Sequence, residues 1–230
     1  MCEVNCDNNN QTDSQFEYDG SVTVKSEGHE LYCLTIIGQI EGHDILPQQF
    51  KTTKYEHVIP QLVAVEQSET VEGLLVILNT VGGDIEAGLA IAELLAGMTK
   101  PTVSLVLGGG HSIGIPLAVA AKHSFIASTA TMTVHPVRTT GTVLGVPQTM
   151  AFFNKIQERI ISFVSANSKV DSSHFRKMMH ATDSELVTDI GTILTGEQAV
   201  ECGLIDKLGS LGDALKYLTD MVRRETENNN

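Results

Sequence analysis

The stretch VSLVLGGGHSIGIPLAVAAKHSFIASTATMTVHP, residues 103–136, decides the fold. Its apolar, β-branched beginning predicts a buried strand, and the three glycines that follow let the backbone turn freely. The apolar residues over 113–121 then predict a buried helix. Ser112 therefore lies where a strand becomes a helix, and His135 ends a further strand predicted over 131–134.

Segments on both sides of this stretch continue the alternation of strand and helix. The apolar run over 73–79 lies between turn residues, as in a parallel strand covered on both faces. Further strands are predicted over 31–40, 124–127 and 204–208, and helices over 58–66, 86–98, 148–166, 175–180, 195–202 and 211–222. Alternating strands and helices predict an α/β fold.

The chain has 230 residues, 42% of them hydrophobic, which suits one large domain with polar tails. The amino-terminal segment is rich in Asn, Asp, Gln and Ser and has few large apolar groups to offset the entropy of ordering. We therefore expect a disordered arm over 1–27, one domain over 28–222 and a disordered charged tail over 223–230.

The formal net charge of −13 makes nucleic acid or an anionic membrane surface an unsuitable primary partner. No stretch approaches the roughly 20 apolar residues of a membrane span, and the amino terminus lacks the regions of a secretory signal. The four cysteines are too scattered for a disulfide framework, so we expect a cytoplasmic protein. Cys2 and Cys6 lack companion ligands, so loose thiols explain them better than a metal site, and no cofactor is predicted.

Ser112 and His135 are the candidate nucleophile and general base. A serine hydroxyl becomes a good nucleophile when a base takes its proton and a third group orients that base. His135 follows Ser112 by 23 residues, which allows one helix and one strand to bring it back beside the serine. His111 adjoins the serine, but neighbouring side chains diverge, so substrate steering or capping suits it better than catalysis. A plain helix cap is the alternative for Ser112.

The turn Gly82-Gly83 brings backbone amides to the carboxyl end of the sheet, where α/β folds place their ligands. Such an amide, together with N–H groups at the start of the helix after Ser112, can stabilise an oxyanion. The sequence GGGHSIG matches neither the GxGxxG dinucleotide pattern nor the GxSxG hydrolase pattern. No single motif therefore identifies the reaction.

Three motifs together resemble the ClpP family of serine peptidases. They are NTVGG at 79–83, HSIG at 111–114 and TVHP at 133–136, where the family reads NSPGG, SMG after small residues, and MIHQP. The resemblance covers about 31–215. It implies a ClpP/crotonase-like α/β fold of repeated strand-helix units with a protruding handle helix.

The resemblance also assigns roles to four residues. Ser112 and His135 fall on the family nucleophile and base, and the amides of Gly83 and Ile113 fall on its oxyanion hole. The family spacing of 29 residues from Gly83 to Ser112 is kept. The resemblance therefore implies a Ser-His-Asp serine endopeptidase that uses no metal.

The acid of the triad is displaced. TGEQAVECGLID over 195–206 matches the family's SAxEAxxYGLID, and counting back from it to the family aspartate reaches Gly191. Asp189 lies two residues earlier and is our candidate, with Asp183 as the reserve, because a shift in this loop can still deliver a carboxylate to the imidazole. The alternative is a site without a properly placed acid, which would be slow or inactive.

Residues 139–168 correspond to the ClpP handle, through which subunit rings stack. The apolar positions of the helix predicted over 148–166 serve either packing within its own domain or a subunit interface. The resemblance implies a homo-oligomeric ring whose core cleaves short or unfolded polypeptides without ATP. An AAA+ unfoldase would be needed for folded substrates, although nothing in the sequence indicates one. The chain most resembles a branch of the family that has HSIG at its serine and is associated with protein translocation. This resemblance implies that the substrates include polypeptides linked to protein export.

Two other functions stay open. A protein that keeps the fold and the oxyanion pocket but hydrolyses slowly could act in assembly or binding, as the replaced NSPGG and the displaced acid indicate. A crotonase-like enzyme of acyl-CoA substrates would also use two amides for an oxyanion.

Overall fold

A nine-stranded sheet organises the molecule, which a computed structural model describes over residues 20–138, 145–182 and 190–228. Its central strands run parallel in the order β2 (His29–Glu41), β4 (Val71–Gly83), β5 (Thr102–Gly110), β6 (His123–Ile126) and β9 (Lys207–Leu208). β1 (Ser21–Ser26) pairs antiparallel with the start of β2, and β3 (Thr52–Lys54) pairs parallel with its end. β7 (Thr131–Val134) pairs with the end of β5 and runs antiparallel to β8 (Thr192–Thr195).

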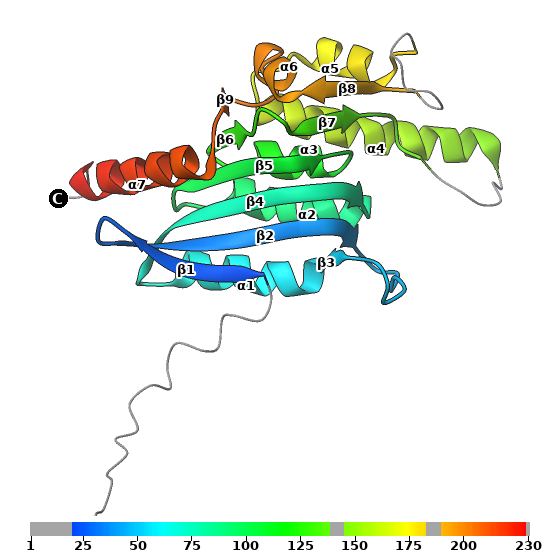
Figure 1. Cartoon of the computed structure of the whole chain (residues 1–230). Coiled ribbons are helices and arrows are strands. Elements are labelled where there is room, and N and C mark those ends of the chain that lie inside the picture. Colours follow the sequence, from blue (N-terminus) through cyan, green and yellow to red (C-terminus); the bar gives the residue numbers. More distant parts are fainter. Residues whose placement is uncertain (1–19, 139–144, 183–189, 229–230) are drawn as a thin grey trace, which may run out of the picture.

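Helices cover the two faces of this sheet unequally (Figure 1). On one face, α1 (Tyr55–Gln67), α2 (Ile85–Ala96) and α3 (Gly114–Val119) form the larger apolar core with the central strands. α4 (Val146–Ala166), α5 (Ser172–Met179) and α6 (Gly196–Glu201) also pack against this core. α7 (Leu211–Asn228) lies on the opposite face, over Leu31, Leu75 and Leu105. The mixed α/β fold predicted from the sequence is confirmed.

The ends of the chain carry more regular structure than the sequence indicated. The expected disordered arm is wrong for residues 20–27, because β1 pairs with β2 along its whole length. The expected disordered tail is wrong for residues 223–228, where α7 continues and Arg223 forms an ion pair with Glu27. At both ends of the chain, contacts with a neighbouring element therefore order a segment whose polar composition predicted disorder. Residues 1–19 and 229–230 lie outside the described part of the chain.

The predicted helices and strands occur with shifted ends, and three strands were missed. The strand predicted over 204–208 is reduced to β9. β1, β3 and β8 are short and partly exposed, so none of them carries the continuous apolar run by which the central strands were recognised. Thr195 caps α6 through a capping box with Gln198, and Gly203 follows that helix with φ of 79°.

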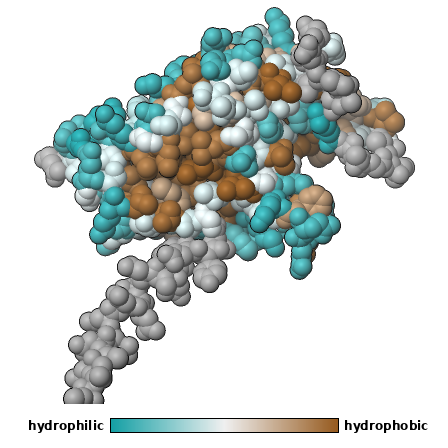
Figure 2. Space-filling model, viewed as in Figure 1, coloured by the Kyte–Doolittle hydropathy of each residue, from teal (hydrophilic) through white to brown (hydrophobic). Residues whose placement is uncertain are grey.

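Part of the sheet face that carries α7 is uncovered by the described residues. α7 lies over the beginnings of the strands, where Leu31 is fully buried. Further along the same face, Ile37 of β2 is 47% exposed and Val22 of β1 is 48% exposed. Figure 2 shows the apolar area that results beside α7, and half-buried Ile77 and Leu107 continue it on β4 and β5. We call these residues the open sheet face.

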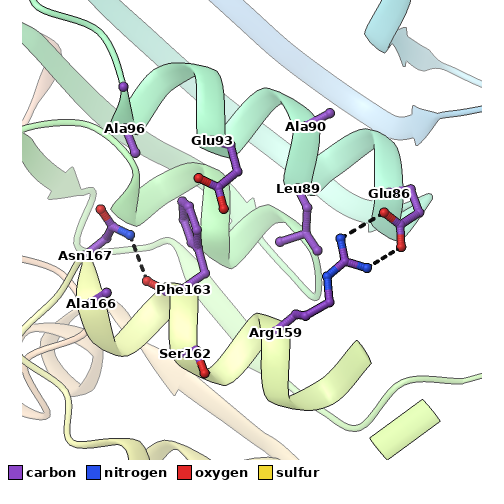
Figure 3. Close-up of a pocket in the computed structure, with 11 residues that line it drawn as sticks. Glu86, Leu89, Ala90, Glu93, Ala96, Arg159, Ser162, Phe163, Ala166 and Asn167 are labelled. Carbon is purple, nitrogen blue, oxygen red and sulfur yellow. Dashed lines mark hydrogen bonds and ion pairs between the residues drawn. The ribbon is translucent and has the colours of Figure 1, made fainter. Parts of the chain in front are cut away.

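On the helical side of the sheet, a groove of about 770 Å³ runs between α2 and α4 (Figure 3). Arg159 of α4 donates to both carboxylate oxygens of Glu86 on α2, at 2.5 and 2.9 Å. Ala90, Ala96 and Ala166 line the groove with small side chains, and Glu93 and Phe163 line it with larger ones. The groove lies on the opposite side of the sheet from the open sheet face.

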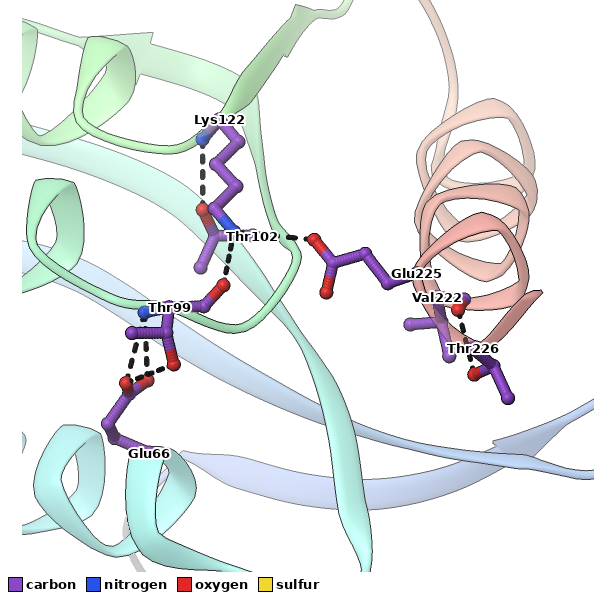
Figure 4. A network of polar contacts seen from close by, with 7 residues as sticks. All are labelled: Glu66, Thr99, Thr102, Lys122, Val222, Glu225 and Thr226. Atoms are coloured by element: carbon purple, nitrogen blue, oxygen red, sulfur yellow. Dashed lines mark hydrogen bonds and ion pairs between the residues drawn. The ribbon is translucent and has the colours of Figure 1, made fainter. Parts of the chain in front are cut away.

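A polar network joins three layers at the amino-terminal ends of β5 and β6 (Figure 4). The Lys122 ammonium contacts the Thr99 carbonyl and lies 3.5 Å from a Glu225 carboxylate oxygen of α7. Glu66 of α1 accepts hydrogen bonds from the Thr99 hydroxyl and N–H at 2.5 and 3.0 Å. Burial acts to raise the pKa of this carboxyl, but these bonds and the neighbouring Lys100 together lower it. The network therefore fixes the end of the sheet opposite to the candidate site.

Candidate active site

The carboxyl ends of β4 and β5 meet the start of α3 at one corner of the sheet. The Thr80 carbonyl of β4 accepts the His111 N–H at 3.1 Å. The Thr80 hydroxyl accepts the Gly82 N–H at 3.0 Å and donates to the Gly38 carbonyl at 2.6 Å. Thr80 is 1% exposed, so these bonds are buried and strong enough to hold the two turns in place.

Ser112 adopts the left-handed backbone conformation, with φ of 57°. A residue with a Cβ reaches this region at a cost of about 1–2 kcal/mol, so surrounding contacts must hold it there. The Ser112 N–H donates to the Thr133 carbonyl of β7 at 2.9 Å, and the Ser112 carbonyl accepts the Ile115 N–H at 3.0 Å. A serine on a strained strand-to-helix turn is the way in which α/β hydrolases present their nucleophile.

His135 directly follows β7, the strand beside the end of β5. Its Nδ1 lies 2.7 Å from the carbonyl oxygen of Pro136. A carbonyl oxygen can accept but not donate, so the bond requires the proton on Nδ1 and leaves a lone pair on Nε2 in the neutral ring. The imidazole is therefore in the tautomer that a general base acting through Nε2 needs.

Ser112 and His135 line one cavity of about 140 Å³. The rest of its wall is mostly apolar and comes from α2 to α5 and from the segment after β7, namely Ile85, Ile113, Ile115, Val134, Val137, Ile160, Phe175 and Met179. Phe175 and Met179 are 1% and 2% exposed, so this wall belongs to the core and is preformed. The structure thus brings the two predicted residues together beside an apolar pocket.

The Gly82-Gly83 turn lies against the serine. A methyl group on Gly82 would lie 2.7 Å from the Ser112 Cβ and 3.3 Å from the Ile113 nitrogen. Gly83 has φ of 156°, and a methyl group on it would lie 2.1 Å from the Ile40 carbonyl oxygen. Both positions therefore require glycine, and Gly83 and Ile113, whose amides are the predicted oxyanion donors, line the same cavity as Ser112.

The predicted acids, Asp189 and Asp183, lie outside the described residues. Gly191, the position reached by counting back along the family motif, packs directly against the histidine. A methyl group on it would lie 2.3 Å from the Val134 carbonyl oxygen and 3.0 Å from the His135 Cβ, and its φ is 138°. No side chain fits there, so position 191 itself cannot supply a carboxylate to His135.

The side chain of His111 contacts a residue of β7 and does not line the cavity. Its Nδ1 lies 2.9 Å from the Thr133 Oγ1, and its ring covers Gly109, where a methyl group would lie 2.4 Å from Nε2. Burial and, secondly, the charge of nearby His135 lower the pKa of His111 below its usual value. The ring is therefore neutral near pH 7. The bond to Thr133 was not predicted from the sequence, because it joins residues 22 positions apart that no local pattern connects.

The described residues provide no cluster of three or more His, Cys, Asp or Glu side chains that could hold a metal ion. Cys33 and Cys202 are free thiols, and burial raises the pKa of each, which makes them poor nucleophiles. Cys2 and Cys6 lie outside the described part of the chain. Within residues 20–138, 145–182 and 190–228, no helix is long and apolar enough to cross a membrane.

Comparison with known proteins agrees with the motifs. The Clp protease family profile matches residues 28–211, which include Ser112 and His135. The chain is 58% identical over 199 residues to the translocation-enhancing protein TepA of Halalkalibacterium halodurans, which covers 86% of this chain and 77% of that protein. It is 28% identical over 207 residues to a candidate protease of Methanocaldococcus jannaschii, covering 79% of this chain and 66% of that protein. The chain therefore belongs to the Clp protease family.

Proposed function

We propose that the protein is a serine endopeptidase that cleaves short or unfolded polypeptides inside a homo-oligomeric ring. The observation that carries the proposal is the strained Ser112 in one apolar cavity with His135, whose Nδ1–H is already bonded to a carbonyl. The family supports a peptidase. A helix cap alone would not require the left-handed conformation of Ser112.

The proposed reaction uses these positions. Nε2 of His135 takes the proton of the Ser112 hydroxyl as Oγ attacks the peptide carbonyl, and the amides of Gly83 and Ile113 bind the oxyanion. The protonated imidazole then gives its proton to the leaving amine, which leaves an acyl-enzyme on Ser112. Water activated by His135 releases the acid product and restores the serine. Asp189 is the proposed acid that stabilises the imidazolium.

A fluorophosphonate probe tests the nucleophile. Such a probe forms a covalent bond with a serine only when a base activates the hydroxyl, so we expect one adduct per chain, located on Ser112 by peptide mass spectrometry. Ser112→Ala should remove it completely. As a matched control, Ser128→Ala replaces an exposed serine and should leave labelling unchanged. An assembled protein that carries no adduct on Ser112 would contradict the proposal.

A weakly catalytic assembly or binding protein is the second candidate, favoured by Gly191 at the family's acid position. The two functions differ in cells. A peptidase fails when its nucleophile is removed, so Ser112→Ala should not complement a deletion of the gene. Full complementation by that variant would favour the binding function.

The apolar cavity beside Ser112 predicts substrate preference. Peptides with Leu or Met before the scissile bond should place that side chain among Ile85, Ile160 and Phe175. Burying such a side chain contributes about 1.5–3 kcal/mol. We therefore expect fluorogenic peptides with Leu or Met at this position to exceed the Asp and Gly peptides by roughly 10- to 150-fold in kcat/KM. Equal rates for the four peptides would show that the cavity does not select substrate.

Two surfaces support assembly into a ring. The open sheet face and the groove between α2 and α4 lie on opposite sides of the sheet. If the open sheet face of one copy contacts the groove of the next copy, all copies are joined head to tail in the same direction. Such head-to-tail contacts close into rings when the rotation allows. Val146, Met150 and Phe152 are more than half exposed on the first part of α4, which favours contact between rings.

Mass photometry of two variants tests the assembly. Ile37→Asp puts a charge on the open sheet face and should reduce the particle to subunits or small oligomers, because burying an unpaired carboxylate is costly. Phe152→Asp should leave single rings of half the mass of a stacked pair. Leu211 is 46% exposed at the start of α7, so Leu211→Asp is the matched control. An unchanged mass for Ile37→Asp would rule out this interface.

The relative named translocation-enhancing protein suggests where the substrates arise. We propose that they include unfolded chains linked to protein export, and that the site lies in the cytoplasm. An AAA+ unfoldase would extend the substrates to folded proteins, and copurification of the assembled protein with an ATPase would identify such a partner.

A further inference from the structure

Two neighbouring residues of the nucleophile turn bond to a single residue of β7. The Ser112 N–H donates to the Thr133 carbonyl at 2.9 Å, and the His111 Nδ1 lies 2.9 Å from the Thr133 Oγ1. Thr133 lies in β7, and His135 directly follows that strand, two residues later. Thr133 is therefore tied to both residues of the turn and lies in the strand that carries the base.

The His111 ring has little freedom to make another bond. Its position over Gly109 depends on the absence of a side chain there, because a Cβ would lie 2.4 Å from Nε2 and 2.8 Å from Cδ2. The His111 N–H is bonded to Thr80 and its carbonyl accepts the Gly114 N–H at 2.9 Å. The residue is thus fixed through its backbone on β4 and α3 and through its ring on β7.

We propose that His111 is a positioning residue, whose bond to the Thr133 hydroxyl holds Ser112 in the left-handed conformation and at a set distance from His135. The inference rests on the peptidase reaction proposed above and adds to it a residue that touches neither substrate nor the reacting atoms. A left-handed serine persists when several contacts hold it. The bonds of Ser112 itself are two of them, and the His111–Thr133 bond ties the preceding residue of the turn to the same strand. The lowered pKa of His111 agrees with this role, because a neutral ring exchanges no proton during turnover.

Substitutions of Thr133 test the bond without changing the histidine. Thr133→Val removes the hydroxyl at nearly constant volume, and we expect kcat and the rate constant of fluorophosphonate labelling to fall about 10- to 100-fold because Ser112 moves away from its base. KM should change less than about twofold, since the cavity is intact. Thr133→Ser restores the hydroxyl and should restore the rates. Thr131→Val, the same change two residues earlier in β7, is the control that should leave them unchanged.

The pH profile separates positioning from proton transfer. Because the role proposed for His111 involves no proton transfer, the acid midpoint of kcat should be the same in Thr133→Val as in the wild type. A shifted midpoint, or wild-type rates in Thr133→Val, would overturn the proposal.

If the wild-type protein is not labelled by the fluorophosphonate, the proposed peptidase activity is contradicted, but the role of His111 is still undecided. The inference is then decided by hydrogen exchange over residues 108–115. Faster exchange in Thr133→Val than in Thr133→Ser and Thr131→Val supports it, because the Ser112 N–H bond to β7 is weakened. Equal exchange in the three variants overturns it.

Discussion

Replacing His135 by alanine should lower kcat by a factor on the order of 10⁶, the loss found when a triad loses its base. Without Nε2, no group on the described cavity wall is placed to take the Ser112 proton. His111 does not replace it, because its ring is bonded to Thr133 and covers Gly109. Steady-state hydrolysis of a Leu-containing peptide measures the effect, and labelling of Ser112 should fall in parallel.

The control for this prediction is His174→Ala. His174 is exposed on α5, away from the cavity wall, so its loss should leave kcat unchanged within about a factor of two. If His135→Ala kept more than a hundredth of the wild-type rate, a different base would have to serve Ser112.

Much of the fold could be predicted from the sequence because its central strands carry continuous apolar runs. β4 and β5 were recognised from such runs, and α2 from its broad apolar face. β8 was missed because a four-residue strand with exposed Ile193 has no periodicity to detect. Its place is decided by pairing with β7, a contact about 60 residues away in the chain that no local pattern encodes.

The site was predictable to a different degree. Gly82 and Gly83 follow a buried strand in the sequence, and their close approach to Ser112 and Ile40 explains why glycine occurs at both positions. The left-handed conformation of Ser112 was not predicted, because serine does not favour it and tertiary bonds impose it. The Pro136 carbonyl was missed for a similar reason, since any residue offers a carbonyl and only the structure shows which one accepts.

The contact between His135 and Pro136 changes what is expected of the proposed acid. In a triad whose aspartate alone orients the histidine, replacing it by asparagine costs about 10⁴ in kcat, because the amide stabilises the wrong tautomer. Here the Pro136 carbonyl oxygen lies 2.7 Å from the His135 Nδ1 and accepts its proton, which already selects the correct tautomer. The remaining contribution of Asp189 would be to stabilise the imidazolium charge.

Asp189→Asn should therefore lower kcat by about 10², equivalent to about 2.7 kcal/mol of transition-state stabilisation. KM should stay the same, because the proposed acid acts on the imidazolium that forms in the transition state and not on bound substrate. Asp183→Asn, the same change in the same loop, is the matched control and should alter kcat less than about twofold. A larger loss in Asp183→Asn than in Asp189→Asn would make Asp183 the acid. Wild-type rates in both variants would mean that neither aspartate is the acid, and would leave the Pro136 carbonyl as the described acceptor of the His135 Nδ1 proton.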